Sequence, residues 1–223
     1  MPPAPVVAFS DVGKAFANGV VALDRLDLDV REGEFLTLLG PSGCGKSTAL
    51  RMIAGLSAPS SGALGWREGR TPELGFVFQE PTLMPWANVW NNAYLPLRLR
   101  GISKAEAAPA IGKALALVGL ERFERAWPRE LSGGMKMRVS IARALTLRPP
   151  LLLMDEPFAA LDEITRMRLN NDLLALKREL GTTIVFVTHS VFESVYLSTR
   201  IAVFSARPGR VTQTFDIAGP AVR

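Results

Sequence analysis

The sequence predicts an α/β fold in which helices cover both faces of a mostly parallel sheet. Three observations lead to this prediction. Short apolar runs alternate with amphipathic runs along most of the 223 residues. Several apolar runs are nearly continuous, which is typical of strands buried on both faces. The stretch of roughly 80–130 breaks the alternation and predicts a helical insert.

The first third of the chain contains three predicted strands and one predicted helix. Residues 6–12 and 23–30 are predicted strands, and the second alternates apolar and polar residues with period 2. Residues 33–40, GEFLTLLG, form a strand that is expected to be buried on both faces. Residues 47–56 follow directly as a helix. Strand–helix units of this kind build parallel sheets.

The helical insert contains a helix whose start is marked by a capping box, Ser103 with Glu106. Apolar residues at helical spacing follow, and Gly119 ends the run. Pro109 lies inside this segment. Because proline removes a backbone hydrogen bond, the helix is expected either to start near Pro109 or to bend there.

Strand and helix alternate again in the last third. Residues 151–156 and 182–189 are predicted buried strands, and a helix closed by Gly181 lies between them. Residues 200–217 predict a hairpin that turns at Pro208-Gly209. The apolar face of the helix is marked by Leu169, Leu173, Leu176 and Leu180.

The composition is that of an ordinary globular protein, with 48% hydrophobic and 21% charged residues. The single cysteine, Cys44, rules out an internal disulfide and favours a reducing compartment. The longest apolar runs are far shorter than the ~20 residues that span a bilayer. Residues 1–7 lack the features of a signal peptide. We therefore expect a cytoplasmic protein.

The formal net charge is +5. A charge of this size either serves solubility or attracts anionic surfaces and phosphate ligands. No run of five basic residues occurs in the sequence, which argues against nucleic acid as a partner.

Residues 40–48, GPSGCGKST, match the pattern G-x-x-x-x-G-K-[ST] between a predicted buried strand and a predicted helix. In this context the amides of a glycine-rich turn and the positive helix end form an anion cradle. We expect Lys46 to reach the β- and γ-phosphates of a nucleotide and the Ser47 hydroxyl to bind Mg²⁺. Cys44 is expected to pack and not to react. The predicted nucleotide-binding residues of the loop are Gly40, Pro41, Ser42, Gly43, Cys44, Gly45, Lys46, Ser47 and Thr48.

Two acidic residues, Asp155 and Glu156, stand at the end of a predicted buried strand. Open α/β sheets place their ligands at the carboxyl ends of the strands. We expect Asp155 to hold Mg²⁺ through water and Glu156 to polarise the attacking water. The alternative is a pair of surface acids with no role in chemistry.

His189, the only histidine, ends the predicted strand 182–189. A lone histidine is more often structural than catalytic, but an imidazole beside the two motifs above could bind the γ-phosphate and orient water. Gln79 ends another apolar run, 74–79, and could contact Mg²⁺ or water; alternatively it is a polar loop residue. The predicted catalytic residues are Lys46, Gln79, Glu156 and His189.

These motifs, in this order, resemble those of the ATP-binding subunits of ABC (ATP-binding cassette) transporters. Six ordered motifs are far more specific than one phosphate-binding loop. An aromatic residue stacks on adenine in this family, and Phe16 is the matching position; alternatively, Phe16 is an ordinary core or loop aromatic. The motifs are the Walker A loop at 40–47, the Q-loop residue Gln79, the signature LSGGM at 131–135, the Walker B pair Asp155 and Glu156, the D-loop ALD at 160–162 and the switch histidine His189.

The resemblance implies a P-loop NTPase core of ABC ATPase type with an N-terminal antiparallel β region and a helical subdomain at about 80–148. It also implies a single such domain over residues 1–223, with no C-terminal regulatory domain. The implied activity is hydrolysis of ATP to ADP and phosphate, coupled to transport across a membrane. The implied cofactors are ATP and Mg²⁺.

The resemblance further implies a head-to-tail homodimer with two ATP molecules at its interface. Each ATP lies between the Walker A loop of one subunit and the signature loop of the other. The Ser132 hydroxyl and the amides of Gly133 and Gly134, at a helix N-terminus, form the second anion cradle. Asp162 is implied to bridge the two halves.

A narrower resemblance is to the nitrate, sulfonate and taurine importers, carried by residues 78–101, the signature and the ARPGRV segment at 206–211. It implies a small solute of that class, a two-subunit permease and a periplasmic or lipid-anchored binding protein. The implied location is the cytoplasmic face of a bacterial inner membrane. An importer of pyrimidine or thiamine precursors is the alternative. Trp86 and Trp90 either meet a coupling helix of the permease or form the core of the helical subdomain.

Two other kinds of ABC protein fit less well. Soluble ABC ATPases that act on DNA or ribosomes have a long coiled-coil insertion or a second cassette, and this sequence has neither. A non-hydrolysing regulatory cassette is disfavoured by the presence of Glu156 and His189.

The segment after the signature glycines departs from the family pattern, because Met135 and Met137 replace glutamines. We expect both methionines to pack the signature helix. Lys136 and Arg138 are expected either to add positive potential near the nucleotide or to face solvent.

Overall fold

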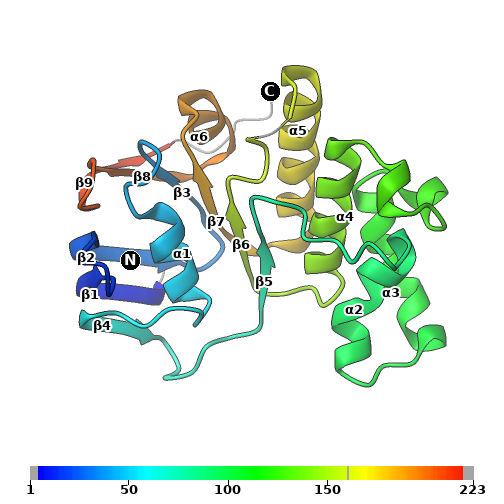
Figure 1. Ribbon diagram of the computed structural model, residues 1–223, viewed down its shortest axis with the longest axis horizontal. Helices are drawn as coiled ribbons and strands as arrows, with labels where there is room; N and C mark the ends of the chain where they lie inside the picture. Colours follow the sequence, from blue (N-terminus) through cyan, green and yellow to red (C-terminus); the bar gives the residue numbers. More distant parts are fainter. Residues whose placement is uncertain (1–4, 160, 218–223) are drawn as a thin grey trace.

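The computed structural model describes residues 5–159 and 161–217. Within them, the main sheet has six strands in the order β5-β6-β7-β3-β8-β9, and every pairing is parallel except that of β8 with β9 (Figure 1). The predicted parallel sheet and closing hairpin are therefore confirmed. The strands are β3 (Phe35–Leu39), β5 (Leu74–Val77), β6 (Leu151–Asp155), β7 (Thr183–Thr188), β8 (Arg200–Phe204) and β9 (Val211–Asp216).

A second sheet confirms the antiparallel N-terminal region, with β1 (Pro5–Ala15) between β2 (Val21–Arg31) and β4 (Ser61–Trp66). The period-2 pattern predicted for β2 is only partly right. Alternate residues are buried from Leu26 onward, but Leu23 is also buried and breaks the alternation. A register shift against β1 at this point lets β2 bury both sets of residues.

Helices cover both faces of the main sheet. α1 and the antiparallel sheet lie on one side, whereas α4, α5 and α6 lie on the other (Figure 1). α2 and α3 pack with α4 away from the sheet and form the helical subdomain. No helix among residues 5–159 and 161–217 is both long and apolar enough to cross a membrane. The helices are α1 (Lys46–Ile53), α2 (Val89–Leu99), α3 (Lys104–Leu117), α4 (Gly133–Leu145), α5 (Glu163–Leu180) and α6 (Val191–Leu197), with short 3-10 helices at Glu121–Phe123 and Pro128–Glu130.

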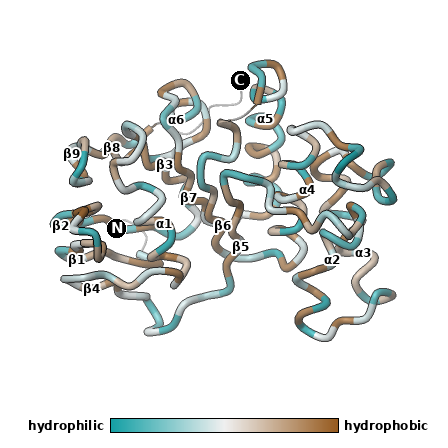
Figure 2. Tube along the Cα trace, viewed as in Figure 1, coloured by the Kyte–Doolittle hydropathy of each residue, from teal (hydrophilic) through white to brown (hydrophobic). Residues whose placement is uncertain are grey.

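The central strands are largely apolar because they supply two separate cores. On β6, Leu151 and Leu153 join the core beneath α1, whereas Leu152 and Met154 join the core beneath α4 and α5. Side chains of a strand alternate between faces, so a strand covered on both sides has no polar face. Figure 2 shows the resulting hydrophobic band along β5, β6 and β7.

Helix ends agree with the sequence signals in two cases and differ in two. The capping box of Ser103 and Glu106 is present, and Gly181 ends α5 in the left-handed conformation. However, α3 neither starts near Pro109 nor stops there, since one continuous helix runs through it from Lys104. α1 ends at Ile53, earlier than the predicted 56, and Gly55 turns the chain with a positive φ of 70°.

A buried ion pair joins Glu34, the residue before β3, to Arg200 of β8 and leads to a stability prediction. Arg200 donates from Nε to Glu34 Oε2 at 2.9 Å and from Nη2 to Glu34 Oε1 at 2.8 Å, and both residues are buried. Arg200→Met would leave the Glu34 carboxylate buried without its partner, so we expect a loss of about 3–5 kcal/mol in unfolding free energy. Chemical denaturation of the variant and of wild type measures this loss in unfolding free energy. The control is Arg70→Met, because within the described part of the chain Arg70 pairs with Glu68 alone, at the surface. Equal losses in both variants would contradict the prediction.

Candidate active site

A glycine-rich loop, residues 40–45, connects β3 to the N-terminus of α1. Gly43 and Gly45 have positive φ angles of 74° and 104°. A Cβ on Gly45 would lie 2.6 Å from the Ala22 carbonyl oxygen, so no larger residue fits there. The loop therefore turns tightly and ends at a helix N-terminus, which is the geometry of a phosphate cradle.

Beside the loop lies a small cavity of about 150 Å³. Some of the residues that line it were predicted to bind the nucleotide, and others were not. Four residues of the predicted loop do not line it, namely Gly40, Pro41, Ser42 and Cys44. Cys44 is buried in the core, as expected. The lining residues are Phe16, Val20, Ala22, Gly43, Gly45, Lys46, Ser47, Thr48, Glu156 and Arg207.

Lys46 is almost fully buried, and its ammonium lies at the edge of this cavity. Nζ donates hydrogen bonds to the carbonyl oxygens of Gly40 at 2.8 Å and Pro41 at 2.9 Å. It lies 3.8 Å from Glu156 Oε1. The loop thus holds the lysine charge at the place where phosphate oxygens would enter.

Ser47 and Asp155 come together from α1 and the end of β6, as predicted. The Ser47 hydroxyl donates to Asp155 Oδ1 at 2.6 Å. Burial raises the pKa of the Asp155 carboxyl, although the hydrogen bond from Ser47 and the charge of Arg51 act against this rise. A hydroxyl and a carboxylate are oxygen ligands of the kind that suits Mg²⁺, which usually completes its shell with substrate phosphates and water. The residues present therefore fit the metal.

Asp155→Asn is expected to raise the melting temperature at neutral pH while reducing ATP hydrolysis about 10- to 100-fold. The pKa of Asp155 is raised in the folded chain, so the ionised carboxylate destabilises the fold above that pKa. Below the unfolded pKa this destabilisation vanishes, and the two proteins should converge. Thermal denaturation between about pH 3 and pH 8 measures the difference. A lower melting temperature of Asp155→Asn at pH 7 would show that the Ser47 bond outweighs desolvation.

Glu156 and His189 meet because β6 and β7 are neighbouring parallel strands. Oε2 of Glu156 lies 3.1 Å from Nδ1 of His189. Glu156 has a positive φ of 43°, a conformation that is strained for a residue with a side chain and that turns the carboxylate out of the strand. With Nδ1 facing Glu156, Nε2 is the ring nitrogen left for a phosphate or water. Two residues that were predicted separately as catalytic are thus in contact at the strand ends.

A polar network that the sequence did not reveal supports His189. Glu193, buried on α6, accepts a hydrogen bond from the Thr188 hydroxyl, which itself accepts from the Ser190 amide at 3.0 Å. Burial raises the pKa of Glu193, although the Thr188 hydrogen bond and the charge of Arg166 oppose this rise. Arg166 of α5 lies 3.7 Å from Glu193 and donates to the Leu161 carbonyl at 3.0 Å. The segment around His189 is thereby tied to the start of α5.

Phe16 and Gln79 are placed differently relative to the cavity. Phe16 lines it, its side chain is half exposed, and Lys14 Nζ lies 5.5 Å from the ring centroid. Gln79 follows β5, which pairs with β6, so it lies at the same edge of the sheet. It is exposed and does not line the cavity.

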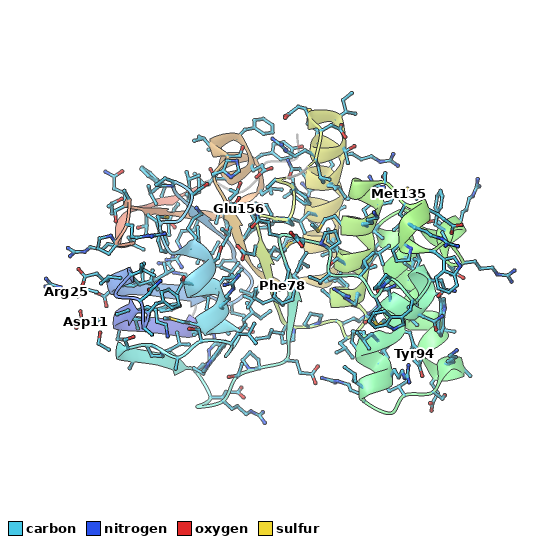
Figure 3. The ribbon with its side chains drawn as sticks, viewed as in Figure 1. Asp11, Arg25, Phe78, Tyr94, Met135 and Glu156 are labelled. Carbon is cyan, nitrogen blue, oxygen red and sulfur yellow. The ribbon has the colours of Figure 1, made fainter. Side chains whose placement is uncertain are left out.

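The signature residues lie outside this cavity. Ser132 caps α4, where its hydroxyl accepts a hydrogen bond from the Met135 amide at 3.3 Å. Gly133 is exposed, whereas Gly134 is buried, and a Cβ on it would lie 2.8 Å from Thr165 of α5. Figure 3 shows Met135 on the helical side of the molecule, well away from Glu156.

Asp162 of the predicted D-loop caps α5 and accepts a hydrogen bond from the Thr165 amide at 2.9 Å. Hydrogen bonds from Thr165 lower the pKa of its carboxyl. Ala160 of the same motif lies outside the described residues.

The packing of the helical subdomain shows the outcome of three expectations, which concern the two methionines, Arg138 and the two tryptophans. Met137 is buried and Met135 is partly buried, as predicted. The expectation for Arg138 was wrong, because this residue is buried, donates to the Val118 carbonyl and pairs with Asp172 at 3.7 Å. The two tryptophans divide between the two interpretations: Trp90 packs against the core, whereas Trp86 is 74% exposed.

Comparison with known proteins identifies the family. The family model for ABC transporters matches residues 23–159. The chain belongs to the ABC transporter family. This assignment agrees with the ordered motifs and with the cavity that Lys46 and Glu156 line.

Within the ABC transporter family, this chain is similar to import ATP-binding proteins and to a solved ATP-binding cassette. It is 44% identical to a taurine import ATP-binding protein of Rhizobium johnstonii over 91% of this chain and 79% of that protein. It is 43% identical to a nitrate import ATP-binding protein of Synechocystis sp. over 95% of this chain and 82% of that protein. A dimeric ATP-binding cassette, solved in a post-hydrolysis state with ADP and Pi, superposes with a TM-score of 0.85 at 33% identity, covering 96% of this chain and 99% of that one.

Proposed function

We propose that this ABC ATPase supplies the energy for import of a small solute of the nitrate, sulfonate or taurine class. Relatives named as taurine, nitrate and aliphatic sulfonate import ATP-binding proteins support this class. The chain would act at the cytoplasmic face of a bacterial membrane, beneath a two-subunit permease that receives the solute from a binding protein. Import of a pyrimidine or thiamine precursor is the alternative.

The observation that carries the ATPase assignment is that Lys46 and Glu156 line one cavity, while His189 contacts Glu156. Glu156 would accept the proton of the attacking water, and His189 would bind the γ-phosphate through Nε2. Lys46 would offset the phosphate charge without leaving the loop. Mg²⁺, held by Ser47 and Asp155 and approached by Gln79, would neutralise phosphate charge.

Phe16 is proposed to stack on the adenine base. Its half-exposed ring lines the same cavity as the loop, so a base placed on it keeps the phosphates within reach of Lys46. An aromatic ring offers a flat apolar face of the kind on which a planar base stacks.

The proposed dimer follows from where the signature lies. Ser132, Gly133 and Gly134 form a helix N-terminus that does not line the cavity of their own chain. A head-to-tail partner could bring this second anion cradle onto the nucleotide. The similar cassette that was solved as a dimer with ADP and Pi supports the formation of a dimer. Asp162 would lie at this interface.

Trp86 is the proposed contact with the permease. It is strongly exposed in the segment between β5 and α2, while Trp90 is fixed in the core of the helical subdomain. An exposed tryptophan on a rigid support is typical of a residue at a protein interface.

The test is solute uptake in the source bacterium. Cells lacking the chain are complemented with wild type or Glu156→Gln, and uptake of nitrate, taurine and an alkanesulfonate is measured. We expect cells that lack the chain to lose uptake of one of the three solutes, and only wild type to restore that uptake. Unchanged uptake of all three, with loss of thiamine-precursor uptake, would favour the alternative; no loss of any solute would overturn the importer assignment.

A further inference from the structure

The turn between β8 and β9, residues 205–210, packs directly against the Walker A loop. Arg207 Nε donates to the Gly43 carbonyl at 3.0 Å, and the Gly209 amide donates to the Ala22 carbonyl at 2.9 Å. A Cβ on Gly209 would lie 2.0 Å from the Cys44 carbonyl oxygen, so only glycine allows this approach. The turn is therefore fixed beside the phosphate cradle.

Arg207 projects from this turn onto the cavity. It is one of the lining residues, as are Phe16 and Lys46. Its guanidinium lies against the loop, since a Cβ on Gly43 would come within 3.1 Å of Nη2. The remaining donors belong to an exposed side chain and are accessible to a ligand.

The charge of Arg207 is not neutralised by a carboxylate. Among residues 5–159 and 161–217, it forms no ion pair, whereas Arg210 of the same turn pairs with Asp24. Lys46, the other cation lining the cavity, lies 3.8 Å from Glu156. Arg207 is thus the cation at the cavity whose charge is available to an incoming anion.

We propose that Arg207 is a further nucleotide-binding residue, whose guanidinium binds the α- and β-phosphates of ATP while its Nε holds the Walker A loop through Gly43. Lys46 and Glu156 mark the γ-phosphate end of the cavity, and Phe16 marks the proposed base end. Arg207 contacts Gly43 of the glycine-rich loop, and the backbone amides of such a loop cradle the α- and β-phosphates. A planar guanidinium suits phosphate oxygens because it presents several donors in one plane. This inference rests on the proposed placement of ATP.

The test compares Arg207→Gln with Arg210→Gln. Glutamine at 207 removes the charge but retains an N–H group that can donate to Gly43. Isothermal titration of ATP, ADP and adenosine at low and high salt gives the affinities. For Arg207→Gln we expect ATP and ADP to bind about 10-fold more weakly at low salt, equivalent to about 1.4 kcal/mol, with adenosine unchanged. The loss should shrink at high salt. Arg210→Gln should bind all three as wild type does.

The outcomes separate this inference from the proposed function. If Arg207→Gln binds ATP and ADP as wild type does, Arg207 only supports the loop and the inference fails. An equal loss of adenosine binding would also overturn it, because a general distortion would then explain the result. Failure of wild type to bind ATP would instead contradict the proposed function.

Discussion

Glu156→Gln is expected to reduce ATP turnover by about 100-fold or more, with ATP affinity close to that of wild type. Glutamine has the same size and keeps an oxygen near His189, but it cannot accept a proton from water. The carboxylate is held at a strained strand end, 3.1 Å from His189 Nδ1 and 3.8 Å from Lys46 Nζ. Steady-state phosphate release measures turnover, and equilibrium titration measures affinity.

The same variant should accumulate as an ATP-bound dimer, because hydrolysis is the step that removes the γ-phosphate from the interface. Light scattering with and without ATP measures the molecular mass of the variant and so distinguishes monomer from dimer. Glu179→Gln is the matched control, since Glu179 is an exposed glutamate at the end of α5 away from the cavity. Near-normal hydrolysis by Glu156→Gln would show that another group activates the water.

Ser132→Arg should reduce ATPase activity by about 10- to 100-fold and leave the ATP affinity of the monomer largely intact. The large side chain would block the α4 N-terminus, but Ser132 does not line the cavity of its own chain. The control is Ser103→Arg. Ser103 is likewise an exposed N-cap serine, on α3, so this variant loses a comparable helix cap, worth about 1 kcal/mol, without touching the signature.

A mixing experiment decides whether the site is shared. Ser132→Arg has an intact Walker A loop, and Lys46→Ala has an intact signature. In a head-to-tail heterodimer, one of the two sites combines both intact halves, so mixing the two inactive proteins should restore activity. Lack of rescue, with heterodimers shown by pull-down, would mean that each chain completes its own site.

Much of the candidate site could be predicted because its groups are close in sequence. Gly43, Gly45 and Lys46 lie within one loop, and the backbone conformation of that loop depends mainly on the glycines themselves. The end of α5 at Gly181 was predictable for the same reason. In contrast, β4 has a short, partly exposed sequence with no clear period, and it is a strand only because β1 pairs with it.

Side-chain roles that depend on distant partners could not be predicted. Arg138 was expected near the nucleotide or in solvent, but α3 and α5 supply the Val118 carbonyl and Asp172 that bury it. Trp86 and Trp90 are similar residues in one segment, yet only Trp90 reaches the core. Such differences arise from packing, which the periodicity of a segment does not specify.

The sequence by itself determined the family, the phosphate loop and the strand–helix order, because each depends on local residue types and on their spacing. Only the tertiary structure decided which groups meet. Parallel pairing of β6 and β7 joins Glu156 to His189, and the turn after β8 brings Arg207 onto Gly43, 164 residues away. Contacts at such separations are set by sheet order, and sheet order results from the burial of two cores at once.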